Sequence, residues 1–117
     1  KTDNQQYFED IEKGRNVLEK SISSDEKMLY RPPYGKLLFS QYNYLKKKYQ
    51  LVLWDVLSYD FDLKISKETV LKNSLKHSRD GSIIVFHDSI KAAEKLLYSL
   101  PTYLDYFSEK GYTFEKL

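Results

Sequence analysis

The chain has 117 residues, a net charge of +2, no cysteine, and hydrophobic and charged fractions of 41% and 31%. This length fits one domain or part of one, and the small net charge gives no support to nucleic-acid binding. The absence of cysteine excludes disulfides and thiolate metal ligands. No apolar run approaches the roughly 20 residues that a membrane-spanning helix needs.

The first half of the sequence predicts a helix, a strand and a second helix. The apolar residues of the first segment recur at helical spacing, namely Tyr7, Phe8, Ile11, Leu18 and Ile22. A short apolar strand at 28–30 runs into two prolines, which end it in an extended turn at 31–35. Helical spacing returns over 38–49, where Lys46-Lys47-Lys48 is expected on a solvated helix end.

The second half continues the alternation. Residues 51–56 form a nearly continuous apolar run, typical of a strand buried on both faces. Ser66 is expected to cap a helix that ends near Gly81, and 82–86 predicts another buried strand. A helix over 92–107, which Pro101 either kinks or divides, is followed by a last strand at 112–115. The order α-β-α-β-α-β-α-β predicts an α/β fold with parallel strands, either a small open sheet or half of a closed barrel.

Unusual residues gather where three of the predicted strands end. They are Arg31 to Gly35 after the first strand, Asp55, Ser58, Asp60 and Asp62 at or after the second, and His87 with Asp88 after the third. The carboxyl ends of parallel strands share one rim, and α/β folds place their chemistry there. The pattern therefore predicts a functional site at this rim.

His87 is the strongest candidate in this set. It ends a very apolar strand, so its imidazole is expected to be half-buried at the rim, with Asp60 on the adjacent strand end as its partner. Asp88 is a poorer partner, because neighbours on an extended chain point to opposite faces. His77 stands at a helix end beside Lys76 and is interpreted as structural or solvent-facing.

Three segments, in this order and spacing, resemble the third, fourth and fifth motifs of the polysaccharide deacetylases, the family built on the NodB-homology domain. They are Arg-Pro-Pro-Tyr-Gly at 31–35, Trp-Asp-Val-Leu-Ser-Tyr-Asp-Phe at 54–61 and Ile-Ile-Val-Phe-His-Asp at 83–88. The resemblance implies that residues 1–117 are the C-terminal part of a distorted (β/α) barrel. It also implies a divalent metal, commonly zinc, and removal of acetyl groups from N-acetylglucosamine units or, less often, of acetyl esters.

The resemblance further implies roles for individual residues. His87 would be the general acid that protonates the sugar nitrogen, and the carboxylate of Asp60 would hold the ring and favour its charged form. The backbone N–H of Tyr34 would help to bind the oxyanion, and Arg31 would orient the base.

Other residues would contact the substrate. Val85 and Phe61 would line the pocket for the acetyl methyl group, although the family usually has tryptophan at the position of Phe61. Tyr59 and Tyr34, on the rim, are candidates for stacking on a sugar.

The family's first two motifs, an Asp-Asp pair and His-x-x-x-His, supply the base and the metal ligands, and neither is present in this sequence. We therefore expect no metal bound by the family's site in this chain, and no activity of the chain alone. The chain begins at Lys1 and its only methionine is Met28, so we expect a trimmed chain or a fragment. Its open sheet edge is expected to need the missing N-terminal half or a second copy.

Two alternatives remain at this point. One is a non-catalytic carbohydrate-binding or interaction module on the same fold. The other is a metal site made by Asp60, Asp62 and His87, for which no fourth ligand is evident. For the deacetylase and for the carbohydrate-binding module alike, the expected partner is an acetylated polysaccharide or oligosaccharide. The family suggests the cell envelope or the extracellular space, and no targeting segment is evident.

Overall fold

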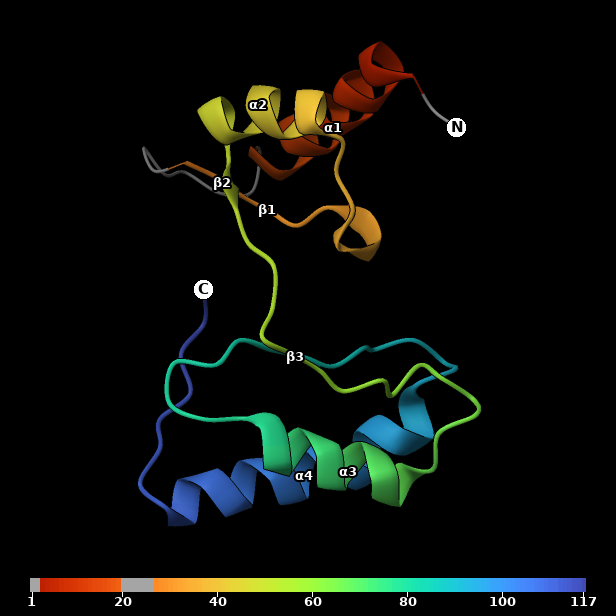
Figure 1. The fold of residues 1–117 in the computed structure, drawn as a ribbon, viewed down its shortest axis with the longest axis vertical. Coiled ribbons are helices and arrows are strands. Elements are labelled where there is room, and N and C mark those ends of the chain that lie inside the picture. The colour runs from red at the N-terminus through yellow and green to blue at the C-terminus, as the bar shows by residue number, and fades with distance from the viewer. Residues whose placement is uncertain (1–2, 20–26) are drawn as a thin grey trace. The chain divides into compact units, whose positions relative to one another are not determined.

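The computed structural model describes residues 3–19 and 27–117, and it divides the chain into two compact units, Lys1–Leu53 and Trp54–Leu117. The first unit contains α1 (Asn4–Glu19), β1 (Leu29–Tyr30), the 3-10 turn η1 (Pro33–Gly35), α2 (Phe39–Lys48) and β2 (Gln50–Leu51) (Figure 1). The second contains β3 (Val56–Leu57), α3 (Lys67–His77), β4 (Ile84–Val85) and α4 (Ala93–Glu109). Helices alternate with short strands in both units, as the sequence predicts.

The first unit is built around one parallel strand pair. Leu29 pairs with Gln50 and Tyr30 with Leu51. The buried hydrophobic residues of α2 and its C-terminal end, Leu45 and Tyr49, contribute to the core. Ile22, predicted to continue the first helix, lies outside the described residues.

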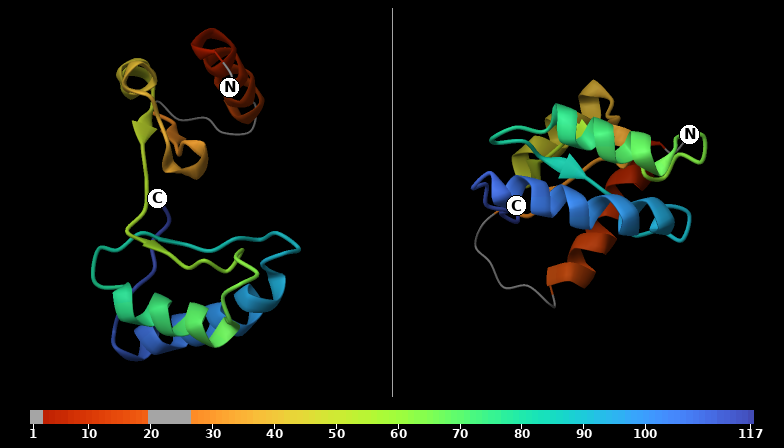
Figure 2. Two further views of the ribbon diagram at one scale, coloured as in Figure 1. Left: turned by 45° about the vertical axis from the view of Figure 1, so that its right-hand side comes forward. Right: turned by 90° about the horizontal axis from the view of Figure 1, so that it is seen from below.

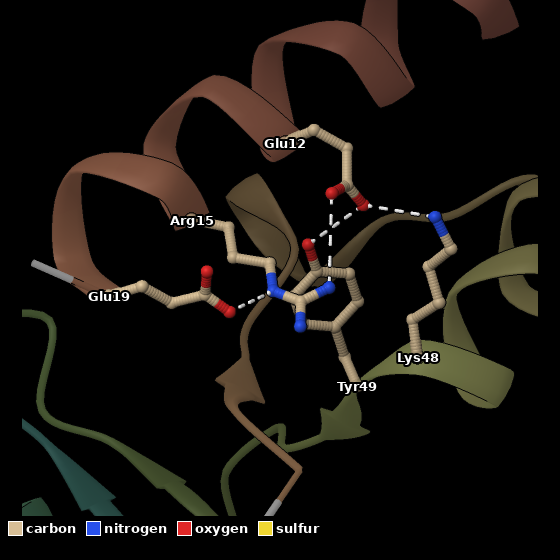
Figure 3. Close-up of polar contacts among 5 residues, drawn as sticks. All are labelled: Glu12, Arg15, Glu19, Lys48 and Tyr49. Atoms are coloured by element: carbon tan, nitrogen blue, oxygen red, sulfur yellow. Dashed lines mark hydrogen bonds and ion pairs between the residues drawn. The ribbon is translucent and has the colours of Figure 1, made fainter. Parts of the chain in front are cut away.

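Polar contacts fasten α1 to the end of α2 (Figure 3). The Tyr49 hydroxyl donates to Glu12 Oε1 over 3.1 Å, and Lys48 Nζ lies 3.3 Å from the same oxygen. Arg15 pairs with Glu19 at 2.8 Å and stands 5.7 Å from the centre of the Tyr49 ring. The Lys46-Lys47-Lys48 run is exposed in the last turn of α2, as predicted.

The second unit is also built on one parallel pair, in which Val56 pairs with Ile84 and Leu57 with Val85. Helices α3 and α4 pack side by side and lie on the same side of these strands (Figures 1 and 2). Each helix buries a small residue, Ser74 on α3 and Ser99 on α4. The ring of Tyr103 contacts those of Phe86 and Phe107, which extends the core toward the end of α4.

The ends of the helices in this unit follow the sequence signals. Ser66 Oγ accepts a hydrogen bond from the backbone N–H of Thr69 at the start of α3. His77, the last residue of α3, is exposed, in agreement with the solvent-facing interpretation. α4 continues through Pro101 as one helix, and Gly111 follows its end with φ +86°.

Two strand predictions are wrong. The run 51–56 is not one buried strand, because its two ends pair with different partners: β2 pairs with β1, and β3 pairs with β4. Between them Leu53 is 51% exposed. The predicted strand at 112–115 does not form, because its residues have no partner strand among the described residues and are all exposed, while the centre of the Tyr112 ring lies 5.1 Å from that of Phe107.

No helix in the described part of the chain is long and apolar enough to span a bilayer.

Candidate active site

The ends of β3 and β4 bring the candidate residues of the second unit together. Because the two strands are parallel neighbours, their carboxyl ends lie at the same edge. Asp60 follows β3 by three residues and His87 follows β4 by two. Between β3 and Asp60, Tyr59 adopts φ +60°, a left-handed backbone conformation that is uncommon outside glycine. The backbone N–H of Asp62 donates to the Tyr59 carbonyl, which closes a turn around Asp60.

Asp60 uses both of its carboxylate oxygens on His87. Oδ1 lies 2.7 Å from the imidazole Nδ1, and Oδ2 accepts the backbone N–H of His87 over 2.7 Å. The Asp60 side chain is fully buried, whereas 38% of the His87 side chain is exposed. A carboxylate can only accept, so Nδ1 carries the proton in this contact and Nε2 is left for other partners. The predicted pairing of His87 with Asp60 rather than Asp88 is therefore confirmed in the structure.

Two aromatic rings flank this pair. The edge of one ring meets the face of the other between Phe61 and His87, with centres 4.9 Å apart. The ring of Tyr59 lies 5.8 Å from that of Phe61, and Tyr59 is 47% exposed. Val85, half-buried on β4, stands two positions before His87, the spacing that places residues of an extended chain on the same face.

The other two candidates lie in the first unit. Arg31 Nη2 donates to the carbonyl of Leu53 over 3.2 Å. Tyr34 has φ +57° within η1, and 91% of the residue is exposed. The structure thus brings together four candidates of the second unit, namely Asp60, His87, Phe61 and Tyr59. Arg31 and Tyr34 belong to the first unit, Lys1–Leu53.

A metal site made of Asp60, Asp62 and His87 is not assembled. Asp62 Oδ1 accepts the backbone N–H of Lys64 over 2.9 Å, and both oxygens of Asp60 are used by His87. Within residues 3–19 and 27–117, no group of three or more histidine, cysteine, aspartate or glutamate side chains is arranged to hold a metal ion. Among the described residues, the three side chains of this alternative are therefore not arranged as one metal site.

Three residues around the pair were not singled out as site residues from the sequence. Ser58 is 2% exposed, and its Oγ accepts the backbone N–H of Asp60 over 3.4 Å. Lys95 Nζ donates to the Asp62 carbonyl, which ties the loop after β3 to α4, and Lys91 Nζ lies 5.8 Å from the centre of the Phe61 ring. Position after a strand already places Ser58 among the unusual residues of the rim, but no residue pattern points to the two lysines.

Comparison with known proteins identifies relatives of this chain. No protein-family model matches the sequence. The chain is 28% identical over 111 residues to the peptidoglycan-N-acetylglucosamine deacetylase of Bacillus cereus. This alignment covers 87% of this chain and 40% of that protein. The solved Bc1960 peptidoglycan N-acetylglucosamine deacetylase, in complex with 4-naphthalen-1-yl-N-oxidanyl-benzamide, matches with a TM-score of 0.85 and 26% identity over 100% of this chain and 55% of that one. The resemblance to the polysaccharide deacetylases is confirmed.

A second solved structure agrees on the fold. The Xyl-CE4 domain of a multidomain xylanase from the hindgut metagenome of Trinervitermes trinervoides matches with a TM-score of 0.82 and 24% identity, over 97% of this chain and 53% of that one. The chain spans about half the length of the relatives that it matches. It is therefore similar to part of a polysaccharide deacetylase.

Proposed function

We propose that this chain is the part of a metal-dependent polysaccharide N-deacetylase domain that carries the general acid. The observation that carries the proposal is the contact between the buried Asp60 carboxylate and the half-exposed His87 ring. The likeness to peptidoglycan N-acetylglucosamine deacetylases supports the reaction class. In this proposal residues 1–117 are a partial catalytic domain, the C-terminal part of a (β/α) barrel.

The geometry suits transfer of a proton to a leaving amine. The Asp60 carboxylate accepts from Nδ1, so the imidazole is fixed in orientation. In the imidazolium form Nε2 also carries a proton, and this is the proton that can be donated. When the amide carbon–nitrogen bond breaks, the sugar nitrogen takes this proton and leaves as an amine. The acyl carbon takes a hydroxide from water, whose proton goes to the base supplied by residues outside this chain, and it leaves as acetic acid, which ionises to acetate.

The remaining candidates have supporting roles in the proposal. Phe61, whose ring lies against His87, and Val85 line the pocket for the acetyl methyl group. Tyr59, exposed beside Phe61, offers a face to a sugar ring. The backbone N–H of Tyr34 helps to bind the oxyanion, and Arg31 orients a base supplied by residues outside this chain.

Other parts of the active site are supplied by residues outside this chain. The divalent metal, zinc in most of the family, is bound by residues outside this chain. The chain alone is therefore inactive, and its unpaired strand edges associate either with the rest of the domain or with a second copy. The substrate is an acetylated glycan such as peptidoglycan, with N-acetyl groups preferred to O-acetyl groups, and the site of action is the cell envelope.

The test is amine release from an acetylated chitooligosaccharide by the longest native form of the protein, with and without zinc. His87→Ala is expected to lower the rate of amine release by roughly 10²- to 10⁴-fold, the range that a general acid contributes. His77→Ala is the matched control, because His77 is exposed at the end of α3. Zinc-dependent release that is equal in the wild type and His87→Ala would contradict the role of His87.

The same experiment separates the enzyme from a carbohydrate-binding module. Glycan binding without amine release, on several acetylated glycans and with metal present, would favour the binding module. Zinc-dependent release by the 117-residue chain alone, lost in His87→Ala, would contradict the expectation that the chain needs the rest of the domain.

A further inference from the structure

Lys91 contacts the ring of Phe61, which in turn contacts His87, the proposed general acid. It lies in the loop between β4 and α4, four residues after His87. Its ammonium is 5.8 Å from the centre of the Phe61 ring, and that ring contacts His87 at 4.9 Å between centres. The distance from the ammonium to the centre of the imidazole is thus at most the sum of these two distances. One or two pyranose units of a glycan span such a length.

The charge of Lys91 is not neutralised within the part of the chain that the structure describes. Lys91 is exposed and forms no ion pair with a described residue, whereas in the same unit Lys67 pairs with Glu94 and His87 with Asp60. Asp88, also exposed in this loop, is not within ion-pair distance of Lys91.

The other acidic side chains near the pair are already in use. Both Asp60 oxygens accept from His87, and Asp62 Oδ1 accepts the backbone N–H of Lys64. The ammonium of Lys95 donates to the Asp62 carbonyl and so adds a second cation beside the loop. The rim therefore presents a positive charge next to the group that protonates the leaving amine.

We propose that Lys91 binds a carboxylate of the glycan, carried on the sugar next to the acetylated one or on a substituent of that sugar. This inference rests on the proposed deacetylase function and narrows its substrate class to acidic glycans. A lysine ammonium is a compact point charge that suits a single carboxylate, and the Phe61 face holds it in place by cation–π attraction. A neutral chitin-like chain offers no group for this charge.

The chain contains a lysine that makes a matched control. Lys110 Nζ lies 4.3 Å from the centre of the Tyr106 ring, the same type of contact, but after the C-terminal end of α4, whereas Lys91 precedes that helix. An effect of removing a lysine from an aromatic face in general would appear at both positions. An effect on recognition of the substrate would appear at Lys91 alone.

The experiment compares two acetylated oligosaccharides of equal length. One is a neutral chitooligosaccharide, and in the other N-acetylglucosamine alternates with N-acetylmuramic acid. The second glycan is prepared with and without a stem peptide on the muramic acid. The longest native form is used, as wild type, Lys91→Met, Lys91→Arg and Lys110→Met. Lys91→Met is expected to lower the ratio of kcat/KM on the acidic to the neutral glycan by roughly fivefold, through KM, as befits one solvent-exposed ion pair. Lys91→Arg restores most of the ratio, Lys110→Met leaves it as in the wild type, and added salt reduces the difference.

Equilibrium binding of the same glycans, measured by calorimetry, makes the inference independent of turnover. If neither glycan is deacetylated, the proposed function fails, while a loss of binding to the acidic glycan in Lys91→Met still supports the role of Lys91. A ratio unchanged in Lys91→Met, or changed equally in Lys110→Met, overturns the inference. An effect that needs the stem peptide assigns the carboxylate to the peptide, and an effect without it assigns the carboxylate to the sugar.

Discussion

Asp60 is a buried carboxylate whose two oxygens serve a single neighbour. One oxygen meets the imidazole Nδ1 and the other meets the backbone N–H of His87, each at 2.7 Å. The two contacts fix both the position of the His87 main chain and the direction of its ring. Because the carboxylate is fully buried, no water competes for either contact.

Replacing Asp60 with asparagine should therefore disturb the ring without changing the size of the side chain. The amide has one accepting oxygen where the carboxylate has two, so its NH₂ group faces one of the two N–H donors of His87. We expect kcat on an acetylated glycan to fall by roughly 10²- to 10⁴-fold in the longest native form. Stability should fall by about 1–3 kcal/mol in urea unfolding, since a buried donor loses its partner.

Asp62→Asn is the control for this change. It makes the same substitution two residues away, on a side chain that accepts from the backbone N–H of Lys64 and not from His87. A fall in kcat that is equally large in Asp62→Asn would show that the loop, and not the contact with His87, carries the effect.

At the scale of the elements, α3 is positioned between the loop that carries Asp60 and the strand that leads to His87. Its start depends on Ser66, whose Oγ accepts from the backbone N–H of Thr69 and also contacts the Thr69 hydroxyl at 2.8 Å. The helix then buries Val70 and Ser74 against the rest of the unit. The capping contact thus defines where the loop after β3 ends.

Ser66→Ala is expected to destabilise the protein by about 1 kcal/mol, because the first turn of α3 loses its side-chain acceptor. The measurement is the urea midpoint at constant slope. Ser66→Asn, which keeps a capping oxygen, should retain most of the stability. Equal losses in the two variants would show that the hydroxyl is needed for something other than the cap.

The sequence predicts the main features of these elements because they depend on local patterns. Helical spacing, the Ser66 cap and the alternation of helices with strands are all visible in the residues themselves, and parallel strands bring Asp60 and His87 to one edge. The division of 51–56 between two strand pairs was not predictable, since an apolar run does not show which strand it will pair with. The contact of Lys91 with Phe61 depends on the conformation of two loops, which no residue pattern determines.

At the scale of the whole molecule, tyrosine hydroxyls are part of the packing in both units. Burial, together with a hydrogen bond between the hydroxyls of Tyr30 and Tyr7, raises the pKa of Tyr30. Burial and the nearby carboxylate of Glu12 raise the pKa of Tyr49, and burial raises that of Tyr103. In each case the folded protein favours the protonated phenol.

Stability should therefore decrease in alkaline solution. A tyrosine whose pKa is higher in the folded than in the unfolded state contributes fully below about pH 10, the pKa of an unfolded tyrosine. That contribution is lost as the pH rises above this value, because the unfolded chain releases the proton first. We expect the urea midpoint to be level up to about pH 9.5 and to fall above it.

Two substitutions test whether tyrosine ionisation causes this alkaline decrease in stability. Tyr103→Phe removes a buried phenol and should make the alkaline decrease shallower, whereas Tyr34→Phe changes an exposed phenol and should leave it unaltered. Parallel curves for Tyr103→Phe and Tyr34→Phe would indicate that lysine deprotonation, and not tyrosine ionisation, causes the decrease.

The left-handed backbone of Tyr59 has a consequence in evolutionary terms. A side chain in this conformation costs of order 1 kcal/mol, and glycine, which takes the same region of φ at Gly81 and Gly111, avoids that cost. Selection for stability alone would favour glycine at position 59. The aromatic ring is therefore expected to persist only while the rim beside Asp60 has a ligand to contact, and lineages that abandon the glycan should drift toward glycine or asparagine at this position.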